Sequence, residues 1–392
     1  MPVLRLTPEE RVRIAVLAHL LNFQPGFRQA GVSRYIERLL AALPAAAPED
    51  EIVVFAGRGA TKATAAFDPA LRWLPSRLPT ERPGVRILWE QFAAPPALAR
   101  ERIELVHAPV NVAPVLAGRP AVVTVHDLAF LRYPEQYPGT KQRYLRWMTR
   151  RSVEHAARVI AVSEHTRRDL LNFYHVAPER VVVVPNGVGP EFRPGDDPAE
   201  ARALRATHNL PDEFVLFVGT LQPRKNLLGL LRAWARVETA APLVIVGAPG
   251  WQYQPIFDEV RVLGIGERVI FTGYSGDLAS WYRAATVFVY PSLYEGFGLP
   301  VVEAMACGTP VVTSNVSSLP EVAGDAALMV DPTDQDALAG AIARLLESPE
   351  LRATLRERGL ARAAAFSWER TARETVAVYH SAAGARLAAL AR

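Results

Sequence analysis

The sequence predicts an α/β protein made of two doubly wound, Rossmann-like domains that face each other across a cleft. At 392 residues the chain is too long for one ordinary core, so two domains are expected. Short, continuous runs of β-branched residues alternate with helical stretches along the whole length. Strands that are apolar throughout, and that are separated by helices, are typical of parallel sheets covered on both faces.

The strand-like runs fall into two similar sets. The first set is RIAVLA, EIVVFA, ELVHA, AVVTV, RVIAV and VVVV, and the second is FVLFVG, LVIVG, RVIFTG, TVFVY and PVVTS. Between the sets lies segment 188–214, which is rich in proline, glycine and charge. We therefore predict a first domain over residues 1–190 and a second over residues 191–372, and we expect the final helix, about 373–392, to pack back on the first domain.

The composition is that of a soluble globular protein, with half of the residues hydrophobic and a formal net charge of +4. No run reaches the roughly 18 apolar residues that a membrane span requires, and the N-terminus does not resemble a signal peptide. The single cysteine, Cys307, cannot form an internal disulfide and is expected to be a small core residue. These features predict a cytoplasmic protein.

Residues 131–151 form a basic stretch, with six Arg or Lys against one Glu and with Tyr144, Leu145, Trp147 and Met148 among them. Two interpretations remain open, namely a solvated helix face and a surface that contacts the acceptor or anionic lipid at the inner face of a membrane. A nucleic-acid partner is not expected, because no reading helix, zinc finger or RNA-binding signature accompanies the stretch.

The segment YPSLYEGFGLPVVEAMACGTPVV, residues 290–312, predicts a strand, a glycine loop and then a helix over residues 299–307. The amides and the positive dipole end at such a helix N-terminus attract an anion. Gly296 and Gly298 allow a ligand to approach the backbone closely. This strand-to-helix junction is therefore a candidate binding site.

Two glutamates lie in this junction. Glu303 lies inside the expected helix among small and apolar residues, where a carboxylate needs donors such as the vicinal hydroxyls of a ribose. Glu295 lies in the loop and can accept hydrogen bonds from sugar hydroxyls. The spacing alone is equally compatible with an exposed helix residue and a turn residue.

No metal site is predicted. The sequence DQD at 334–336 looks like a metal-binding D-x-D, but Thr333 and Asp336 are expected to form a capping box for the next helix. Ser318 and Glu321 are expected to form a second cap of this kind. The chain has neither a dinucleotide fingerprint nor the lysine of a P-loop.

Glu295 and Glu303, with GFGLP between them, resemble the E-x7-E signature of the family 4 glycosyltransferases, which are retaining enzymes of the GT-B fold. Four segments resemble this family and follow one another in its order: VSEHTRRDL (162–170), VVPNGV (183–188), VGTLQPRKN (218–226) and residues 272–312. The resemblance implies that the second domain binds a nucleotide-diphospho-sugar and that the first binds the acceptor.

The loop after FVLFVG carries Arg224 and Lys225, where the family usually places diphosphate ligands. A departing nucleoside diphosphate gains negative charge, which fixed cations stabilise without a metal. Thr220 departs from the family pattern, since many members have Arg there. The donor-binding residues that the resemblance implies are Gly219, Thr220, Arg224, Lys225, Gly273, Tyr274, Glu295, Gly296, Phe297, Gly298, Leu299 and Glu303.

His126, which closes the run AVVTV, matches a family histidine beside the donor sugar and the reaction centre. Without the resemblance, a lone histidine is more often structural. The predicted catalytic residues are His126, Glu295, Arg224 and Lys225. Gly31 and Arg34 resemble the family's loop near the diphosphate and acceptor. His107, Asn111 and Asp127 are assigned to the acceptor side. Asp127 is also suited to cap the next helix.

The predicted activity is a retaining, metal-independent transfer of a hexosyl group from a nucleotide-diphospho-sugar to a hydroxyl of a saccharide or lipid-linked acceptor. The segments GTLQPRKN and HDLAFLRYPEQYP resemble the bacterial mannosyltransferase branch, which favours GDP-mannose as the donor. The alternatives are a GT-B sugar-nucleotide epimerase, a phosphorylase and a non-catalytic saccharide-binding protein. A phosphorylase would need a pyridoxal-phosphate lysine, and no lysine follows Lys225.

Overall fold

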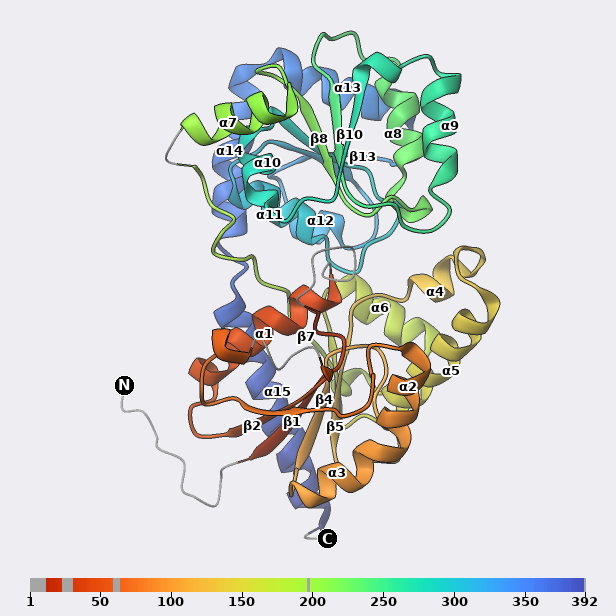
Figure 1. The fold of residues 1–392 in the computed structure, drawn as a ribbon, viewed down its shortest axis with the longest axis vertical. Coiled ribbons are helices and arrows are strands. Elements are labelled where there is room, and N and C mark those ends of the chain that lie inside the picture. The colour runs from red at the N-terminus through yellow and green to blue at the C-terminus, as the bar shows by residue number, and fades with distance from the viewer. Residues whose placement is uncertain (1–11, 23–30, 59–63, 196–197, 391–392) are drawn as a thin grey trace. The chain divides into compact units, whose positions relative to one another are not determined.

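The computed structural model of the chain describes residues 12–22, 31–58, 64–195 and 198–390. It divides into two compact units (Figure 1). The first unit holds the described residues up to Gly187 together with Trp368 onwards, and the second holds Val188–Ser367. Each unit is built on one parallel sheet.

The first sheet has seven strands in the order β3-β2-β1-β4-β5-β6-β7, and all neighbouring pairs are parallel. The second has six strands in the order β10-β9-β8-β11-β12-β13, again all parallel. The strands are β1 (Arg13–Ala18), β2 (Glu51–Ala56), β3 (Arg72–Pro75), β4 (Leu105–Ala108), β5 (Ala121–Val125), β6 (Arg158–Ala161), β7 (Val181–Val183), β8 (Val215–Val218), β9 (Leu243–Val246), β10 (Val269–Gly273), β11 (Val287–Tyr290), β12 (Val311–Ser314) and β13 (Leu328–Val330).

Helices connect the strands and cover both faces of each sheet (Figure 1). They are α1 (Val32–Ala46), α2 (Pro83–Leu88), α3 (Ala94–Arg100), α4 (Ala129–Arg132), α5 (Gly139–His155), α6 (Glu164–Phe173), α7 (Pro198–His208), α8 (Leu227–Trp234), α9 (Gln254–Val262), α10 (Leu278–Ala284), α11 (Leu299–Ala306), α12 (Leu319–Ala323), α13 (Gln335–Glu347), α14 (Pro349–Ala363) and α15 (Trp368–Leu390). Because crossover helices bury both faces, the central strands are mostly apolar, and β9 is apolar and buried along its whole length.

The apolar runs predicted as strands all form strands, whereas β3 and β13 were missed. Both lie at a sheet edge, and neither contains a fully buried residue. An edge strand is paired on one side only, so it does not need a continuous apolar sequence. The pattern that identifies the central strands therefore does not identify these two.

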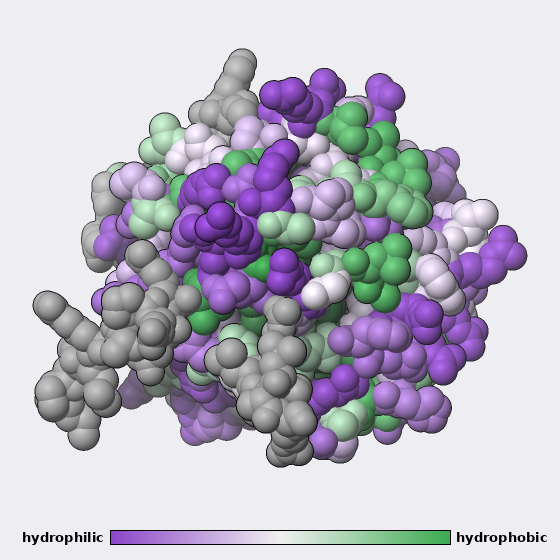
Figure 2. Space-filling model, turned by 90° about the horizontal axis from the view of Figure 1, so that it is seen from below, coloured by the Kyte–Doolittle hydropathy of each residue, from purple (hydrophilic) through white to green (hydrophobic). Residues whose placement is uncertain are grey.

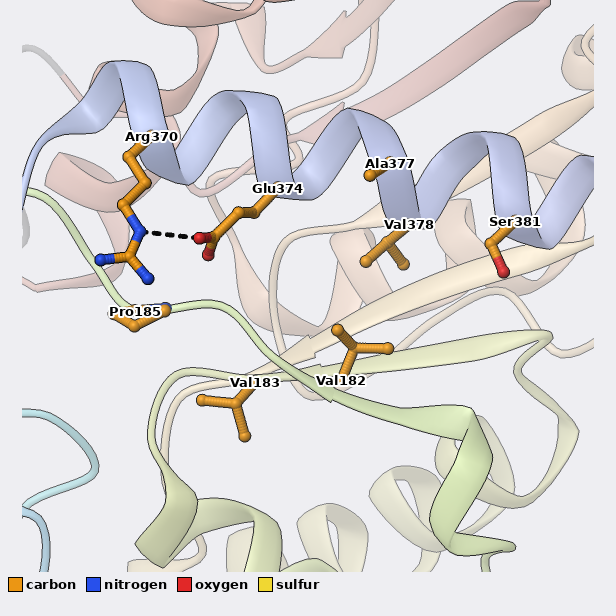
Figure 3. Close-up of a pocket in the computed structure, with 8 residues that line it drawn as sticks. All are labelled: Val182, Val183, Pro185, Arg370, Glu374, Ala377, Val378 and Ser381. Carbon is orange, nitrogen blue, oxygen red and sulfur yellow. Dashed lines mark hydrogen bonds and ion pairs between the residues drawn. The ribbon is translucent and has the colours of Figure 1, made fainter.

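The last helix, α15, belongs to the first unit, although it follows all the strands of the second. It packs against α1, and its Trp368, Ala372 and Tyr379 are buried in the core that contains Tyr35 and Ile36 of α1. A shallow hollow of about 420 Å³ lies between α15 and β7 (Figure 3). Its lining includes an ion pair between Arg370 and Glu374, 2.7 Å apart, and the apolar side chains of Val182, Val183 and Val378.

No helix among the described residues is both long enough and apolar enough to cross a membrane. One face of the molecule shows hydrophilic side chains around several separate hydrophobic groups (Figure 2).

Candidate functional site

The second sheet changes the direction of its connections between β8 and β11. The chain runs from β8 outwards to β9 and β10, and then returns to place β11 on the other side of β8. Open α/β sheets bind ligands at the carboxyl ends of their strands at such a switch point. The loops that leave the carboxyl ends of these two strands carry Arg224 and Lys225 after β8, and Glu295 after β11.

The carboxylate of Glu295 gathers four groups, two from the loop after β8 and two from the end of β11 and the loop after it. Its Oε2 lies 2.9 Å from Nη1 of Arg224, and its Oε1 lies 2.6 Å from Nζ of Lys225. The hydroxyls of Tyr290 and Ser292 donate to the same Oε1 at 3.0 and 2.6 Å. The structure thus brings together three of the residues that the sequence assigned to catalysis, and it adds two hydroxyls.

The electrostatics of this cluster are those of an ionised carboxylate. Burial by itself would raise the pKa of Glu295, but the charges of Arg224 and Lys225 outweigh it and lower the pKa to about 2. Burial, followed by the Glu295 charge, raises the pKa of Tyr290 well above its usual range, so the phenol stays neutral. Two cations face one carboxylate, and the cluster keeps a positive balance.

The loop of Glu295 is fixed by hydrogen bonds to residues far along the chain. The amide of Leu293 donates to the carbonyl of Arg224 at 2.9 Å, and the amide of Glu295 donates to Oγ of Ser317 at 3.0 Å. Oγ of Ser318 lies 2.9 and 2.7 Å from the carbonyls of Glu295 and Phe297. These contacts set the direction of the carboxylate before any ligand binds.

The contacts of Ser318 correct one prediction from the sequence. Ser318 stands at the N-cap position of α12, but its side chain makes no capping hydrogen bond and is instead committed to the glutamate loop. The capping box expected from Thr333 and Asp336 is also wrong. The cap of α13 is Asp334, whose Oδ1 accepts from the amide of Ala337 at 2.9 Å, while Thr333 bonds Asp331.

The helix α11 begins directly after the glutamate loop. Its N-cap is Gly298, which has φ of 111° and no side chain to cap the first turn, and Pro300 occupies that turn. Glu303 lies one turn further along and is only 2% exposed. The hydroxyl of Tyr282 donates to Oε2 of Glu303 at 3.2 Å. The carboxylate that was expected to bind a ribose thus has a protein donor as well.

The end of β8 is shaped by a close approach of two backbones. A Cβ on Gly247 would lie 1.9 Å from the carbonyl oxygen of Gly219, so only glycine fits after β9. Thr220 is half-buried beside this contact. Gly273 is the last residue of β10 and the 40%-exposed Tyr274 follows it, and β10 is separated from β8 by β9. The structure therefore does not place these two residues in the Glu295 cluster.

In the first unit, His126 directly follows β5 and is held on several sides. Its Nε2 donates to the carbonyl of Pro109 at 2.9 Å, and its ring meets Tyr35 edge-on with centroids 4.6 Å apart. Asn111 accepts from the amide of His126 at 3.2 Å and donates to the carbonyl of Asp127 at 2.9 Å. Burial lowers the pKa of His126, so the ring is neutral with Nδ1 as its acceptor.

His107 lies inside β4 and is fully buried. Its Nε2 lies 2.9 Å from Oγ1 of Thr124, and its Nδ1 lies 2.6 Å from the hydroxyl of Tyr379 on α15. Burial lowers the pKa of His107 to about 3. Both nitrogens are therefore used inside the unit, and the structure does not bring His107 to the ligand-facing edge where the sequence had assigned it.

The other first-unit candidates lie at loop and helix ends. Asp127 accepts from the amide of Ala129 at 3.0 Å and thus steadies the start of α4, whose N-cap position is taken by Leu128. Gly31 is the N-cap of α1, with φ of 61°, and the half-buried Arg34 lies in the first turn. The preceding part of the predicted glycine loop, residues 26–30, lies outside the described residues.

Several residues of the site were not found from the sequence. Tyr290 is the last residue of β11 and was taken as part of an apolar strand, although its hydroxyl and that of Ser292 bind Glu295. Ser317 and Gly247 lie far along the chain from the residues that they contact, Glu295 and Gly219. Among the described residues, no group of three or more His, Cys, Asp or Glu side chains could hold a metal ion.

Comparisons with known proteins agree with this geometry. The family model described as Glycosyl transferases group 1 matches residues 201–362, and the model described as Glycosyltransferase Family 4 matches residues 30–192. The O-antigen chain mannosyltransferase B of Escherichia coli is 38% identical over 267 residues, which are 66% of this chain and 70% of that protein. The D-inositol 3-phosphate glycosyltransferase of Acidothermus cellulolyticus is 37% identical over 289 residues, which are 69% of this chain and 63% of that protein.

Among solved structures, the sucrose-phosphate synthase of Thermosynechococcus elongatus superposes with a TM-score of 0.78 and 27% identity, covering 96% of this chain and 100% of that chain. The predicted fold, two parallel α/β domains of the GT-B type, is confirmed by this likeness and by the two sheets.

Proposed function

Because this chain belongs to glycosyltransferase family 4, whose members retain the anomeric configuration, we propose that it transfers a hexosyl group from a nucleotide-diphospho-sugar to a hydroxyl of a saccharide or lipid-linked acceptor. We favour mannose as the sugar and GDP-mannose as the donor. The support is the sequence likeness to an enzyme named as a mannosyltransferase. Polysaccharide biosynthesis in the cytoplasm is the setting that fits this activity.

The observation that carries the proposal is the cluster of Arg224, Lys225 and Glu295 at the switch point of the second sheet. A nucleoside diphosphate leaving group gains negative charge as the glycosidic bond breaks. The positive balance of the cluster and the N-terminus of α11 suit that charge, and a bound metal is not required. In this proposal, Glu295 holds the two cations in place and accepts from sugar hydroxyls, whereas Glu303 accepts from the ribose.

In this proposal the anomeric configuration is retained because the acceptor hydroxyl attacks the anomeric carbon on the same face from which the diphosphate leaves. The departing phosphate oxygen takes the proton of the acceptor hydroxyl, the acceptor oxygen bonds the anomeric carbon, and no covalent glycosyl-enzyme forms. Glu295 is unsuited to be a nucleophile because Arg224 and Lys225 already bind its carboxylate. We propose that His126 orients the sugar. Its backbone carbonyl stabilises the positive charge that develops at the anomeric carbon.

A peripheral contact with anionic membrane is part of the same proposal. Helix α5 holds most of the basic stretch, and its Trp147 is 61% exposed between arginines. Such a surface suits the headgroup region of an anionic bilayer, where aromatic rings and cations both bind. It would bring the enzyme to a lipid-linked acceptor.

The test is a panel of sugar nucleotides followed by release of nucleoside diphosphate, with mannosyl, glucosyl and galactosyl donors offered in the presence and absence of EDTA. We expect GDP-mannose to be turned over fastest, EDTA to change the rate little, and NMR of the product to show the anomeric configuration of the donor. Loss of activity in EDTA with recovery in magnesium or manganese would refute the role given to Arg224 and Lys225. Saccharide binding without turnover of any donor would favour a non-catalytic binding protein.

A further inference from the structure

The first unit contains a hollow of about 930 Å³ at the carboxyl edge of its sheet. Its walls come from the residues that follow β1 and β2, from the start of α1, and from α2 and α5. The first sheet switches direction between β1 and β4, so the hollow lies beside the place where this fold binds ligands. Its volume is within the range of about 300–1,000 Å³ that is usual for small-molecule sites.

The wall of the hollow contains a buried ring nitrogen that has no hydrogen-bond partner among the described residues. His19, directly after β1, is 5% exposed, and its Nδ1 lies 3.1 Å from Oγ1 of the buried Thr80. Its Nε2 is buried and makes no hydrogen bond to any described residue. Burial, followed by the nearby charge of Arg86, lowers the pKa of His19 to about 3, so the ring is neutral. A hydroxyl can donate or accept, so it suits this nitrogen in either tautomer.

The same wall has a positive balance of charge. Among the described residues it presents Arg58, Arg86 and Lys141 against the single carboxylate of Glu81. Glu81 lies 3.5 Å from Arg58 and offsets its charge. The described residues that line the hollow supply no second carboxylate for Arg86 and Lys141. An anionic group is therefore the expected complement of this side of the hollow.

The net charge around Arg86 depends also on the carboxyl group of Glu90, which does not itself line the hollow. Nε of Arg86 lies 3.5 Å from Oε1 of Glu90, which is 5% exposed. Burial raises the pKa of Glu90 to about 7 despite the charge of Arg86. Burial thus disfavours the ionised form of Glu90, which lessens the negative charge that it sets against Arg86.

The rest of the wall is apolar, with Leu20, Val32, Ile87 and Leu145 beside the ring of Tyr144. Such surfaces pack against the apolar faces of a sugar ring or against an alkyl chain. The hollow thus combines a hydrogen-bond partner for a hydroxyl group, cations for an anionic group and an apolar surface.

We propose that this hollow binds the acceptor as a phosphorylated saccharide, with a sugar hydroxyl on Nε2 of His19 and the phosphate on Arg86 and Lys141. The assignment of the ligand as the acceptor rests on the proposed function. The phosphate can belong to a water-soluble sugar phosphate or to the headgroup of a lipid-linked sugar. Both present the same group to the two cations.

The test is calorimetry on the full chain with saturating GDP, so that a donor site is filled before the second ligand is added. Mannose 1-phosphate is expected to bind at least about tenfold more tightly than mannose, since charge-assisted hydrogen bonds exceed neutral ones. Lys141→Met should reduce this preference, because only Arg86 then remains to bind the phosphate, and His19→Phe should weaken the binding of both sugars. Arg151→Met, which removes an exposed cation from the same helix, is the matched control and should change neither.

Equal affinities for mannose and mannose 1-phosphate, or an equal loss in Lys141→Met and Arg151→Met, would overturn the proposal. Phosphatidylcholine vesicles with and without polyprenyl phosphate identify the source of the phosphate. Capture that needs the polyprenyl phosphate and Lys141 assigns the site to a lipid headgroup, whereas binding of the soluble sugar phosphate alone assigns it to a free acceptor. If GDP does not bind but the preference still depends on Lys141, the hollow stands and the proposed function fails.

Discussion

The two sheets share one topological device, but the side chains at their switch points differ in charge. In the second unit, Arg224, Lys225 and Glu295 form an ionised cluster in which hydroxyls fill the remaining positions. In the first unit, burial lowers the pKa of His19 and His126, which leaves neutral rings at the corresponding edge.

The same sheet edge can therefore bind two kinds of ligand. The carboxyl ends of parallel strands provide a preorganised edge in both units, and the loops decide its charge. A charged, buried edge suits a diphosphate whose charge grows during the reaction. An edge of neutral imidazoles suits hydroxyl groups, with cations added only where the ligand itself is anionic.

The largest expected effect is on the charged edge. Glu295→Gln keeps the shape but leaves Arg224 and Lys225 buried without a countercharge, so we expect the free energy of unfolding to fall by about 3–5 kcal/mol. Urea unfolding measures this. The control is Asp336→Asn, which breaks an exposed ion pair with Arg236 and should cost less than about 1 kcal/mol. Similar losses in the two variants would mean that the cluster is not the charged edge that we describe.

A smaller effect is expected at His107, which is buried inside the first unit. Tyr379→Phe removes the hydroxyl 2.6 Å from Nδ1 of His107 and leaves a buried nitrogen unsatisfied, which should cost about 1–3 kcal/mol. Ser381→Ala on the same helix loses only an exposed contact with Arg158 and should be nearly silent. If thermal unfolding does not distinguish the two variants, the contact of α15 with His107 contributes nothing to stability.

The contributions of His107 and Glu295 to stability should also depend on pH in different ranges. The pKa of His107 is lowered from 6.5 to about 3, and that of Glu295 from 4.5 to about 2. A group with a lowered pKa stabilises the fold above its unfolded value and loses that contribution as the pH falls through its folded value. Stability should therefore begin to fall below pH 6.5 through the histidine and below pH 4.5 through the glutamate.

Each group contributes a slope of up to about 1.4 kcal/mol per pH unit. Urea unfolding at a series of pH values should show a shallower slope below pH 6.5 in His107→Gln, and a shallower slope only below pH 4.5 in Glu295→Gln. If both variants flatten the same range, the assignment of the two windows is wrong.

The sequence predicts the central strands well because parallel strands buried on both faces must be apolar throughout. It predicts Arg224, Lys225 and Glu295 as candidates because each follows such a strand. It does not predict that Tyr290 and Ser292 bind the carboxylate, since a tyrosine at a strand end and a serine in a loop are usual there. The prediction that Ser318 caps a helix was wrong because its hydroxyl donates to the carbonyls of Glu295 and Phe297 in a distant loop.

We propose that the charged edge of the second unit holds the donor and that the first unit does not. Calorimetry of GDP binding to wild type, Lys225→Met and His126→Ala tests it directly, with Arg236→Met as the control for removal of an exposed cation. We predict that Lys225→Met weakens GDP at least about tenfold, whereas His126→Ala binds GDP as wild type does although its turnover is much lower. Unchanged GDP affinity in Lys225→Met together with a large loss in His126→Ala would contradict the account.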